Sequence, residues 1–335
     1  MSRSLCLLLI LLCLPLRSAL AEDAAFAAAT IYKLGVKLNN GHGAIGSATL
    51  VAPGRLVTSC HTTRNAVEIR VLHREGELVA SSAQSDLRHD LCMLSVPALR
   101  AQGAERVASR QLTVGQGVAA FGYGNSYRLS MTEGRITALY ELDNAYVVRT
   151  TAAFPRGASG GGLFDEGGRL VGILTFRASI DDQLNYAVPI EWVERLLEDG
   201  SNERTSSSLA FWEDDAPDKP IFLQAAWLEY ARSWKELETV AIDWALREID
   251  NAEAWLVFGR AQVELDQGKE AVLALRRAVA LEPNNTRAWY WLAFAYRSIG
   301  FDSEFVDASA HLERLDPQLA ARLETTSVPA DVEPH

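Results

Sequence analysis

The sequence predicts a protein in two parts, an all-β barrel or sandwich followed by an all-α helical region. Between residues 30 and 186, short strand-like runs alternate with glycine turns, a pattern typical of all-β barrels and sandwiches. Beyond residue 220 the sequence is helical, and Ala254-Trp255 recurs as Ala288-Trp289 at a period of 34 residues. A polar linker with Ser and Pro punctuation, residues 201–219, separates the two parts.

Length and composition exclude several classes of protein. A chain of 335 residues is long enough for two domains, and 48% hydrophobic with 22% charged residues is ordinary for globular protein. The formal net charge of -11 and the pI near 5.1 argue against a nucleic-acid-binding surface. We therefore expect a soluble protein that has no nucleic-acid partner.

The first 21 residues have the features of a secretory signal peptide. Arg3 supplies the positive start, Leu5–Leu16 the apolar run, and Ala19-Leu20-Ala21 the small-residue cleavage site before Glu22. The apolar run is too short for a spanning helix, and no later segment reaches spanning length. We predict export, with the bacterial periplasm as the destination and no membrane span in the mature chain.

Cleavage at this site would leave Cys60 and Cys92 as the cysteines of the mature protein. In an oxidising compartment the two could form a disulfide. They could equally be two separate small hydrophobic residues, and the sequence leaves both alternatives open. A lipoprotein anchored through Cys13 is a weaker alternative, because Leu12 precedes it where a small residue would be expected.

The β part is expected to end in a helix. In Pro189–Glu198 the apolar residues Ile190, Val193 and Leu197 share one helical face, so this segment would close a domain that covers residues 22–200. Within the linker that follows, the apolar residues Leu209, Phe211 and Trp212 are candidates to dock on a neighbouring part. The expected strands are 30–38, 46–51, 55–60, 67–73, 91–96, 117–121, 134–140, 146–151 and 170–176.

The helical part resembles the tetratricopeptide family over residues 220–324. The resemblance implies helical hairpins stacked into a curved solenoid, a shape that binds protein partners. Residues 221–249 look like a degenerate hairpin before the two clearer copies, and 325–335 are expected to be disordered. The residues that carry the resemblance are Trp255, Gly259, Ala271, Ala278 and Pro283 in the first copy and Trp289, Leu292, Tyr296 and Pro317 in the second. Their expected role is packing between helices.

The chemistry is expected to centre on Ser159, in the glycine-rich stretch FPRGASGGGL at 154–163. A serine hydroxyl needs a base within hydrogen-bond reach, itself oriented by an acid. His61 follows an apolar strand that would end beside the core, and Asp90 leads into a buried strand. His89 is the rival base. In the same turn, the backbone amides of Gly157 and Ser159 could point into one pocket that an oxyanion would occupy.

Three motifs in this order resemble the trypsin-like serine peptidases, and most of all their bacterial high-temperature-requirement (Deg-type) branch. They are GSATLVAPGRLVTSCHTT at 46–63, HDLCMLSV at 89–96 and FPRGASGGGLFDEGGRLVGILTF at 154–176. The likeness continues into LNYAVPIEW at 184–192, which resembles the last strand and the start of the closing helix. The resemblance implies two six-stranded antiparallel barrels with the site between them. It makes His61 the general base, Asp90 its orienting acid and Ser159 the nucleophile, with the amides of Gly157 and Ser159 as oxyanion hole. No metal or cofactor is implied.

The sequence departs from that family in several places. Ala158 stands where Asn or Asp is usual, and Cys60 stands where Ala is usual. The peptide-binding domain common in the Deg-type branch is replaced by the helical repeats. The residues expected around the substrate pocket are Ala153, Phe154, Thr175, Phe176 and Arg177, with no carboxylate among them, so a small or medium apolar residue is the expected preference.

Two functions follow as hypotheses. The first is an exported serine endopeptidase that acts on protein or peptide substrates, with repeats that recruit a protein partner or regulate access. The second is an adaptor that keeps the peptidase fold without its activity while the repeats bind proteins.

Overall fold

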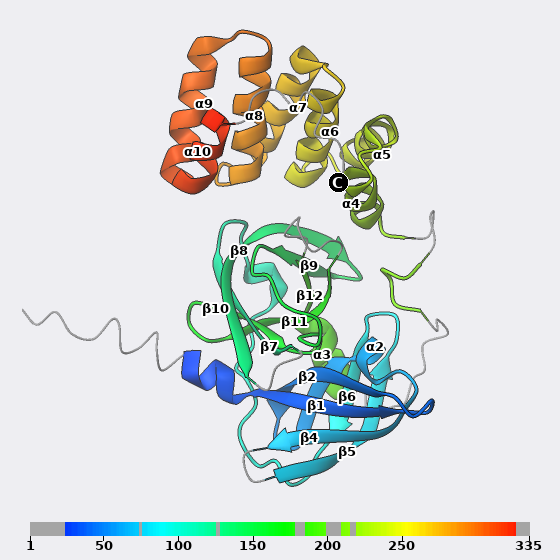
Figure 1. Cartoon of the computed structure of the whole chain (residues 1–335). Coiled ribbons are helices and arrows are strands. Elements are labelled where there is room, and N and C mark those ends of the chain that lie inside the picture. The colour runs from blue at the N-terminus through cyan, green and yellow to red at the C-terminus, as the bar shows by residue number, and fades with distance from the viewer. Residues whose placement is uncertain are drawn as a thin grey trace, which may run out of the picture.

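The computed structural model of the protein describes residues 24–73, 76–124, 128–177, 185–198, 209–214 and 219–325. The predicted signal peptide and the tail beyond residue 325 lie outside the described residues, as does most of the linker. Two β-barrels are followed by a row of helices that lies over one of the barrels (Figure 1).

The first barrel closes in the strand order β1-β2-β3-β6-β5-β4, and each neighbouring pair is antiparallel. Its interior is filled by alternate apolar side chains, such as Leu34 and Val36 of β1 and Leu50 of β2, all almost fully buried. This is the packing expected of strands with period two. The strands are β1 (Ile31–Leu38), β2 (Gly43–Ala52), β3 (Arg55–Ser59), β4 (Ala66–His73), β5 (Gly76–Asp86) and β6 (Leu91–Ser95).

The second barrel closes in the order β10-β11-β12-β9-β8-β7, again antiparallel throughout. The expectation of two six-stranded antiparallel barrels is therefore confirmed. Helix α3 (Ile190–Glu198) follows the last strand and buries Ile190, Trp192 and Val193. The strands are β7 (Gly117–Tyr123), β8 (Leu129–Leu142), β9 (Ala145–Thr150), β10 (Gly162–Asp165), β11 (Leu170–Arg177) and β12 (Asn185–Pro189).

Three features of the barrels differ from the sequence expectation. Strand β5 was not predicted, because its residues are mostly polar and Ala80 is its one buried side chain. Strand β10 was not predicted either, since it has only four residues and follows directly on a glycine run. In addition, the expected strand at 55–60 ends at Ser59, and Cys60–Thr63 form a single helical turn, α2.

The helices pack chiefly against their neighbours in the chain. The period of 34 residues reappears as repeated local bonds. Asn251 and Asn285 cap α6 and α8 through their side chains, and the indole N–H groups of Trp255 and Trp289 donate to the carbonyls of Ile249 and Pro283. Equivalent residues thus make equivalent bonds in both copies. The helices are α4 (Ile221–Tyr230), α5 (Trp234–Arg247), α6 (Ala252–Glu264), α7 (Gly268–Leu281), α8 (Thr286–Ser298), α9 (Asp302–Leu315) and α10 (Pro317–Thr325).

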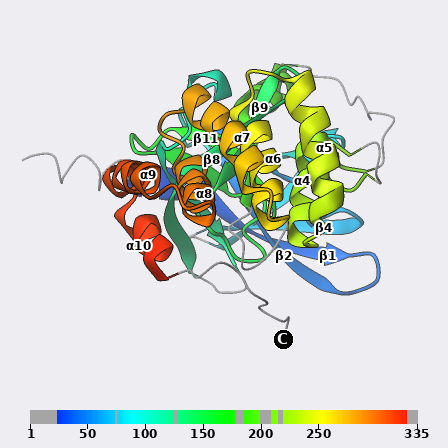
Figure 2. The ribbon, with the colours of Figure 1, turned by 90° about the horizontal axis from the view of Figure 1, so that it is seen from above.

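The helical region shares a core with the second barrel, and it covers that barrel when the molecule is viewed from above (Figure 2). Tyr140 of β8 stacks on Phe222 of α4, with ring centroids 4.2 Å apart. Arg149 of β9 pairs with Glu253 of α6 at 3.0 Å, and both side chains are buried. Burial raises the pKa of the Glu253 carboxyl above its ordinary value, although the charge of the facing Arg149 acts in the opposite direction. A buried ion pair and a shared apolar core fix the helices against this barrel.

Among the described residues, no helix has both the length and the apolar character needed to cross a bilayer. Over the same residues, no group of three or more His, Cys, Asp or Glu side chains is arranged to hold a metal ion.

Candidate active site

His61 and Asp90 form a close pair on the first barrel. The ring Nδ1 of His61 lies 2.6 Å from Oδ2 of Asp90, and the His61 backbone N–H donates to Oδ1 at 2.7 Å. The carboxylate therefore holds the histidine at both its backbone and its ring. Asp90 is 1% exposed, whereas a third of the His61 side chain is accessible, so the imidazole faces open space while its acid partner is enclosed.

The two ring nitrogens of His61 differ in their contacts. Over the described residues, Nε2 makes no hydrogen bond, whereas Nδ1 is bonded to Asp90. A carboxylate at Nδ1 favours the tautomer with its proton on that nitrogen, which leaves Nε2 as an acceptor. This is the state that a general base requires.

Local backbone geometry holds Asp90 in position. Its φ of 59° lies in the left-handed region, which is uncommon for a residue with a Cβ. Its carbonyl accepts the N–H of Cys60 at 2.9 Å, directly before His61. The hydroxyl of Thr175, on β11 of the second barrel, donates to Asp90 Oδ2 at 2.9 Å. Asp90 is thus bonded to both barrels.

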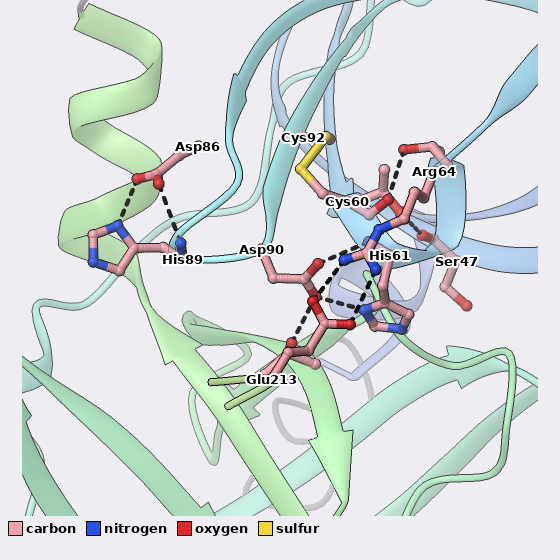
Figure 3. The surroundings of a disulfide bond; sticks show 12 residues. Ser47, Cys60, His61, Arg64, Asp86, His89, Asp90, Cys92 and Glu213 are labelled. Carbon is pink, nitrogen blue, oxygen red and sulfur yellow. Dashed lines mark hydrogen bonds and ion pairs between the residues drawn. A yellow bond between two sulfur atoms is a disulfide. The ribbon is translucent and has the colours of Figure 1, made fainter. Parts of the chain in front are cut away.

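Cys60 and Cys92 form a disulfide, which resolves the two alternatives that the sequence left open (Figure 3). Cys60 directly precedes His61, and Cys92 lies two residues after Asp90. The bridge joins β6 to the turn that carries His61, where Thr58 and Cys92 already pair across β3 and β6. It therefore links the two segments that carry the histidine and the aspartate.

Ser159 lies on the loop between β9 and β10 of the second barrel. Its hydroxyl donates to the carbonyl of Thr175 at 3.0 Å rather than to His61. Thr175 thus meets Ser159 through its carbonyl and Asp90 through its hydroxyl. One residue of β11 connects the serine to the histidine–aspartate pair.

The backbone amides of this loop divide into two groups. The N–H groups of Ala158, Gly160 and Gly161 donate to carbonyls of Pro155, Leu174 and Ala158, respectively. Those of Gly157 and Ser159 donate to no partner within the described residues. Gly157 has a φ of +93°, a conformation that favours glycine. The two free donors are the pair that the sequence predicted for an oxyanion.

The serine loop is fastened to the first barrel by two residues that the sequence analysis did not single out. Ser47 donates from its N–H to the carbonyl of Ser159 at 3.1 Å and from its hydroxyl to that of Gly157 at 3.0 Å. Thr49 donates its hydroxyl to the carbonyl of Gly160 at 3.0 Å. The sequence carries one signal for this role. Two hydroxyl side chains stand at alternate positions of a strand that is otherwise apolar and buried.

Gly160 allows this close contact between the barrels. A Cβ at this position would lie 2.1 Å from the Ser47 carbonyl oxygen and 2.4 Å from the Thr58 hydroxyl. Its φ of +87° also favours glycine. Ala158 in this loop is fully buried, so apolar packing holds the loop at this position. In the family that the sequence resembles, a larger polar side chain is usual here.

The rival base, His89, has a different environment. Its Nδ1 lies 2.6 Å from Asp86 Oδ2, its Nε2 lies 2.8 Å from Asp143 Oδ2, and its ring packs on Trp192 at 3.8 Å. Both ring nitrogens are therefore occupied. His89 connects the end of β5 in the first barrel to the β8–β9 turn of the second.

The expected pocket residues lie near Ser159 in the chain and on β11. Phe154 is buried in the core of the second barrel, and Ala153 is exposed. Thr175 is buried and makes the two contacts described above. Phe176 stacks on Tyr186 at 4.5 Å, and Arg177 is half-buried. The β11–β12 pairing shifts register between Leu174 and Arg177, so the ladder is interrupted at Thr175 and Phe176.

The barrel part of the chain has relatives among known proteins. Residues 46–173 match the family model described as a trypsin-like peptidase domain. Serine endoprotease DegS of Haemophilus influenzae is 32% identical over 168 residues, which are 46% of this chain and 49% of the relative. A probable periplasmic serine endoprotease DegP-like of Halomonas elongata is 32% identical over 173 residues, covering 48% and 36% of the two chains.

A solved structure of similar fold is titled "HtrA-type protease AlgW with tripeptide". It has 27% sequence identity and a TM-score of 0.50, covering 54% of this chain and 64% of that protein. The chain thus carries a trypsin-like peptidase domain with Deg- and HtrA-type serine protease relatives. It spans half or less of the length of the two curated relatives above.

Proposed function

We propose that the protein is a serine endopeptidase in which His61 is the general base, Asp90 its orienting acid and Ser159 the nucleophile. The observation that carries the proposal is the junction at Thr175. Its carbonyl accepts the Ser159 hydroxyl at 3.0 Å, and its hydroxyl donates to Asp90, which holds His61 at 2.6 Å. These contacts connect a hydroxyl, an imidazole and a buried carboxylate from two barrels through one residue, Thr175.

The proposed reaction begins with a rotation of the Ser159 side chain. Its hydroxyl turns from the Thr175 carbonyl toward Nε2 of His61, which accepts the proton as the oxygen attacks the peptide carbonyl. The negative oxygen that forms is received by the free N–H groups of Gly157 and Ser159. Removing one such donor from an oxyanion hole typically costs about 10²–10³-fold in kcat.

The intermediate then collapses. His61 gives its proton to the leaving amine, and the first product departs, leaving an ester on Ser159. A water molecule, deprotonated by His61, hydrolyses that ester and regenerates the hydroxyl. Asp90 holds the ring of His61 throughout and stabilises the imidazolium that forms in each step.

Protein or peptide substrates are proposed because the solved relative is titled with a bound tripeptide. The pocket is proposed to be lined by Ala153, Phe154, Thr175, Phe176 and Arg177. None of these side chains is a carboxylate, so nothing in this set would bind a basic residue. A small or medium apolar residue before the cleaved bond is the proposed preference.

The remaining assignments extend the proposal to the whole chain. Residues 22–200 would form the peptidase domain, 201–219 a linker and 220–324 tetratricopeptide-type repeats that recruit a protein partner or regulate access. Repeated caps and indole bonds at a period of 34 residues support the repeat assignment. Export to the periplasm rests on the predicted signal peptide, 1–21, and on relatives described as periplasmic.

A silent adaptor is the second candidate. The observation that favours it is the Ser159 hydroxyl, which donates to Thr175 rather than to His61. In this alternative the barrels serve as a scaffold for the helices.

A fluorophosphonate probe separates the two, because it labels only a serine that is activated as a nucleophile. Full-length mature protein should be labelled at Ser159, and Ser159→Ala and His61→Ala should abolish labelling. The variant Ser208→Ala, which changes a serine of the predicted linker, is the matched control and should be labelled normally. A folded wild-type protein that resists labelling would favour the adaptor.

A further inference from the structure

A short segment between α3 and α4, residues 209–214, packs beside the candidate active site. We call it the docked segment. Phe211 is fully buried and donates its N–H to the carbonyl of Arg88 at 3.0 Å. This contact lies two residues before Asp90. The linker is therefore in part an ordered component of the site.

Two acidic residues fasten the docked segment at its far end. The Glu213 carboxylate accepts two hydrogen bonds from the Arg64 guanidinium, at 3.1 and 2.7 Å. Asp214 forms an ion pair with Arg88. A bidentate arginine–carboxylate pair has fixed geometry as well as energy, so the segment is held in one orientation. Figure 3 shows Glu213 and Arg64 beside His61 and Asp90.

Trp212, between these anchors, touches the candidate base. Its indole meets the imidazole of His61 edge to face, with centroids 6.1 Å apart and planes at 89°. It also stacks on Phe176, with centroids 4.7 Å apart and planes at 18°. Both separations lie within the range of directly contacting aromatic rings, so no side chain fits between them.

The position of Phe176 relates this contact to a bound peptide. Phe176 follows Thr175, the residue whose carbonyl accepts the Ser159 hydroxyl, and both lie where the β11–β12 ladder is interrupted. The pairing of β10 with β11 also ends at Ile173, so Thr175 and Phe176 have no ladder partner in β10. An extended peptide can add at such unpaired backbone by hydrogen bonds. Successive side chains of that peptide would point to opposite sides. If the residue before the cleaved bond enters the pocket, the preceding one faces His61 and Trp212.

We propose that Trp212 is a specificity-determining residue of the peptidase. Its indole forms the wall of the subsite for the second residue before the cleaved bond and restricts that subsite to small side chains. The inference rests on the proposed function and adds a determinant to it. Trp212 lies outside residues 46–173, the range that matches the peptidase family, so the determinant comes from the segment that follows the barrels.

The test compares full-length wild-type protein with Trp212→Ala on two peptides that differ only at that position, Ala in one and Leu in the other. The wild type should favour the Ala peptide. Trp212→Ala should raise the ratio of kcat/KM for Leu over Ala by about 10-fold or more, in the range that pocket contacts with a few carbon atoms produce. Trp212→Phe, which keeps a smaller ring, should give an intermediate ratio.

Two controls make the result specific. Trp227→Ala removes an exposed tryptophan of α4, 62% accessible, and should leave the ratio unchanged. Arg64→Gln weakens the anchor of the docked segment and should shift the ratio in the direction of Trp212→Ala, by a smaller factor. A purely structural role of Trp212 would lower kcat/KM equally for both peptides.

Fluorophosphonate labelling distinguishes a failure of this inference from a failure of the proposed function. Normal labelling of wild type and variant with an unchanged peptide ratio would overturn this inference alone. Absence of labelling in folded wild type would overturn the proposed function, and the inference with it. Should Trp212→Ala fail to fold, the ratios for Trp212→Phe and Arg64→Gln decide the question.

Discussion

Two histidine–aspartate pairs near the barrel interface are built alike at Nδ1 of the histidine and differ at Nε2. In each pair one carboxylate oxygen accepts the histidine backbone N–H, and the other lies 2.6 Å from Nδ1: Asp90 with His61, and Asp86 with His89. At His89 the second ring nitrogen is bonded to Asp143. At His61 it has no partner among the described residues.

The comparison shows that a close carboxylate does not by itself make a histidine a base. The His89 side chain is 9% exposed and has no free acceptor, so its two bonds join the barrels. The His61 side chain is 33% exposed, and its Nε2 has no hydrogen-bond partner among the described residues. The proposed distinction between a structural role for His89 and a chemical role for His61 therefore rests on the second ring nitrogen.

The largest effect should separate the two histidines. His61→Ala is expected to lower kcat for peptide cleavage by at least about 10⁴-fold, because the proposed base is lost. His89→Ala should change kcat less than about tenfold and instead lower the free energy of unfolding by about 1–3 kcal/mol, since two carboxylates lose a hydrogen-bond partner. Kinetics and urea unfolding of both variants measure this, and equal kinetic losses would contradict the distinction.

Substitution of each aspartate should affect kcat in the same way as substitution of the histidine that it contacts. Asp90→Asn is expected to lower kcat about 10⁴-fold, because an amide at Nδ1 no longer fixes the required tautomer. Asp86→Asn serves as the matched variant and should stay within about tenfold of the wild type. Steady-state kinetics on one peptide substrate decides this. A large kinetic loss in Asp86→Asn would mean that the second pair also supports the chemistry.

Only the His61–Asp90 pair is flanked by a disulfide, and this difference should appear in stability. The double variant Cys60→Ala/Cys92→Ala should lower the free energy of unfolding by about 3–4 kcal/mol, as expected for opening a loop whose ends are 32 residues apart. Reductant should lower the Tm of the wild type and leave that of the double variant unchanged. If reductant has the same effect on both, the bridge is absent in solution.

The smallest expected effect concerns pH at the second pair. Burial raises the pKa of the Asp86 carboxyl, but the hydrogen bonds from His89 and its charge outweigh that, so the pKa lies below its ordinary value. A lowered folded-state pKa means that the stabilisation is present above the unfolded-state pKa, near 4, and is lost as the pH falls through the folded-state pKa.

The stability difference between wild type and Asp86→Asn should therefore be largest above about pH 5 and shrink as the pH falls below about 4. Unfolding curves at a series of pH values measure it. A difference that is constant across this range would show that the Asp86 contact is independent of ionisation.

Much of the fold was predictable because strands and helices are encoded locally. The glycine turns and apolar runs predicted most barrel strands, and the period of 34 residues predicted the helical part. Strand β5 was not predicted because it is largely exposed and polar, and β10 was not predicted because four residues carry little periodic signal. His61, Asp90 and Ser159 were predicted from motifs, and the contacts of His61 with Asp90 and of Ser159 with Thr175 are consistent with that prediction.

The type and order of the chemical groups can therefore be predicted from local sequence, since each group is specified by its neighbours in the chain. The connections between these groups depend on the tertiary structure. The Cys60–Cys92 bridge, the junction at Thr175, the contacts of Ser47 and Thr49 with the serine loop, and the position of Trp212 against His61 all join residues distant in sequence. Local patterns carry no information on such contacts, because they form only when two barrels and a docked segment pack together.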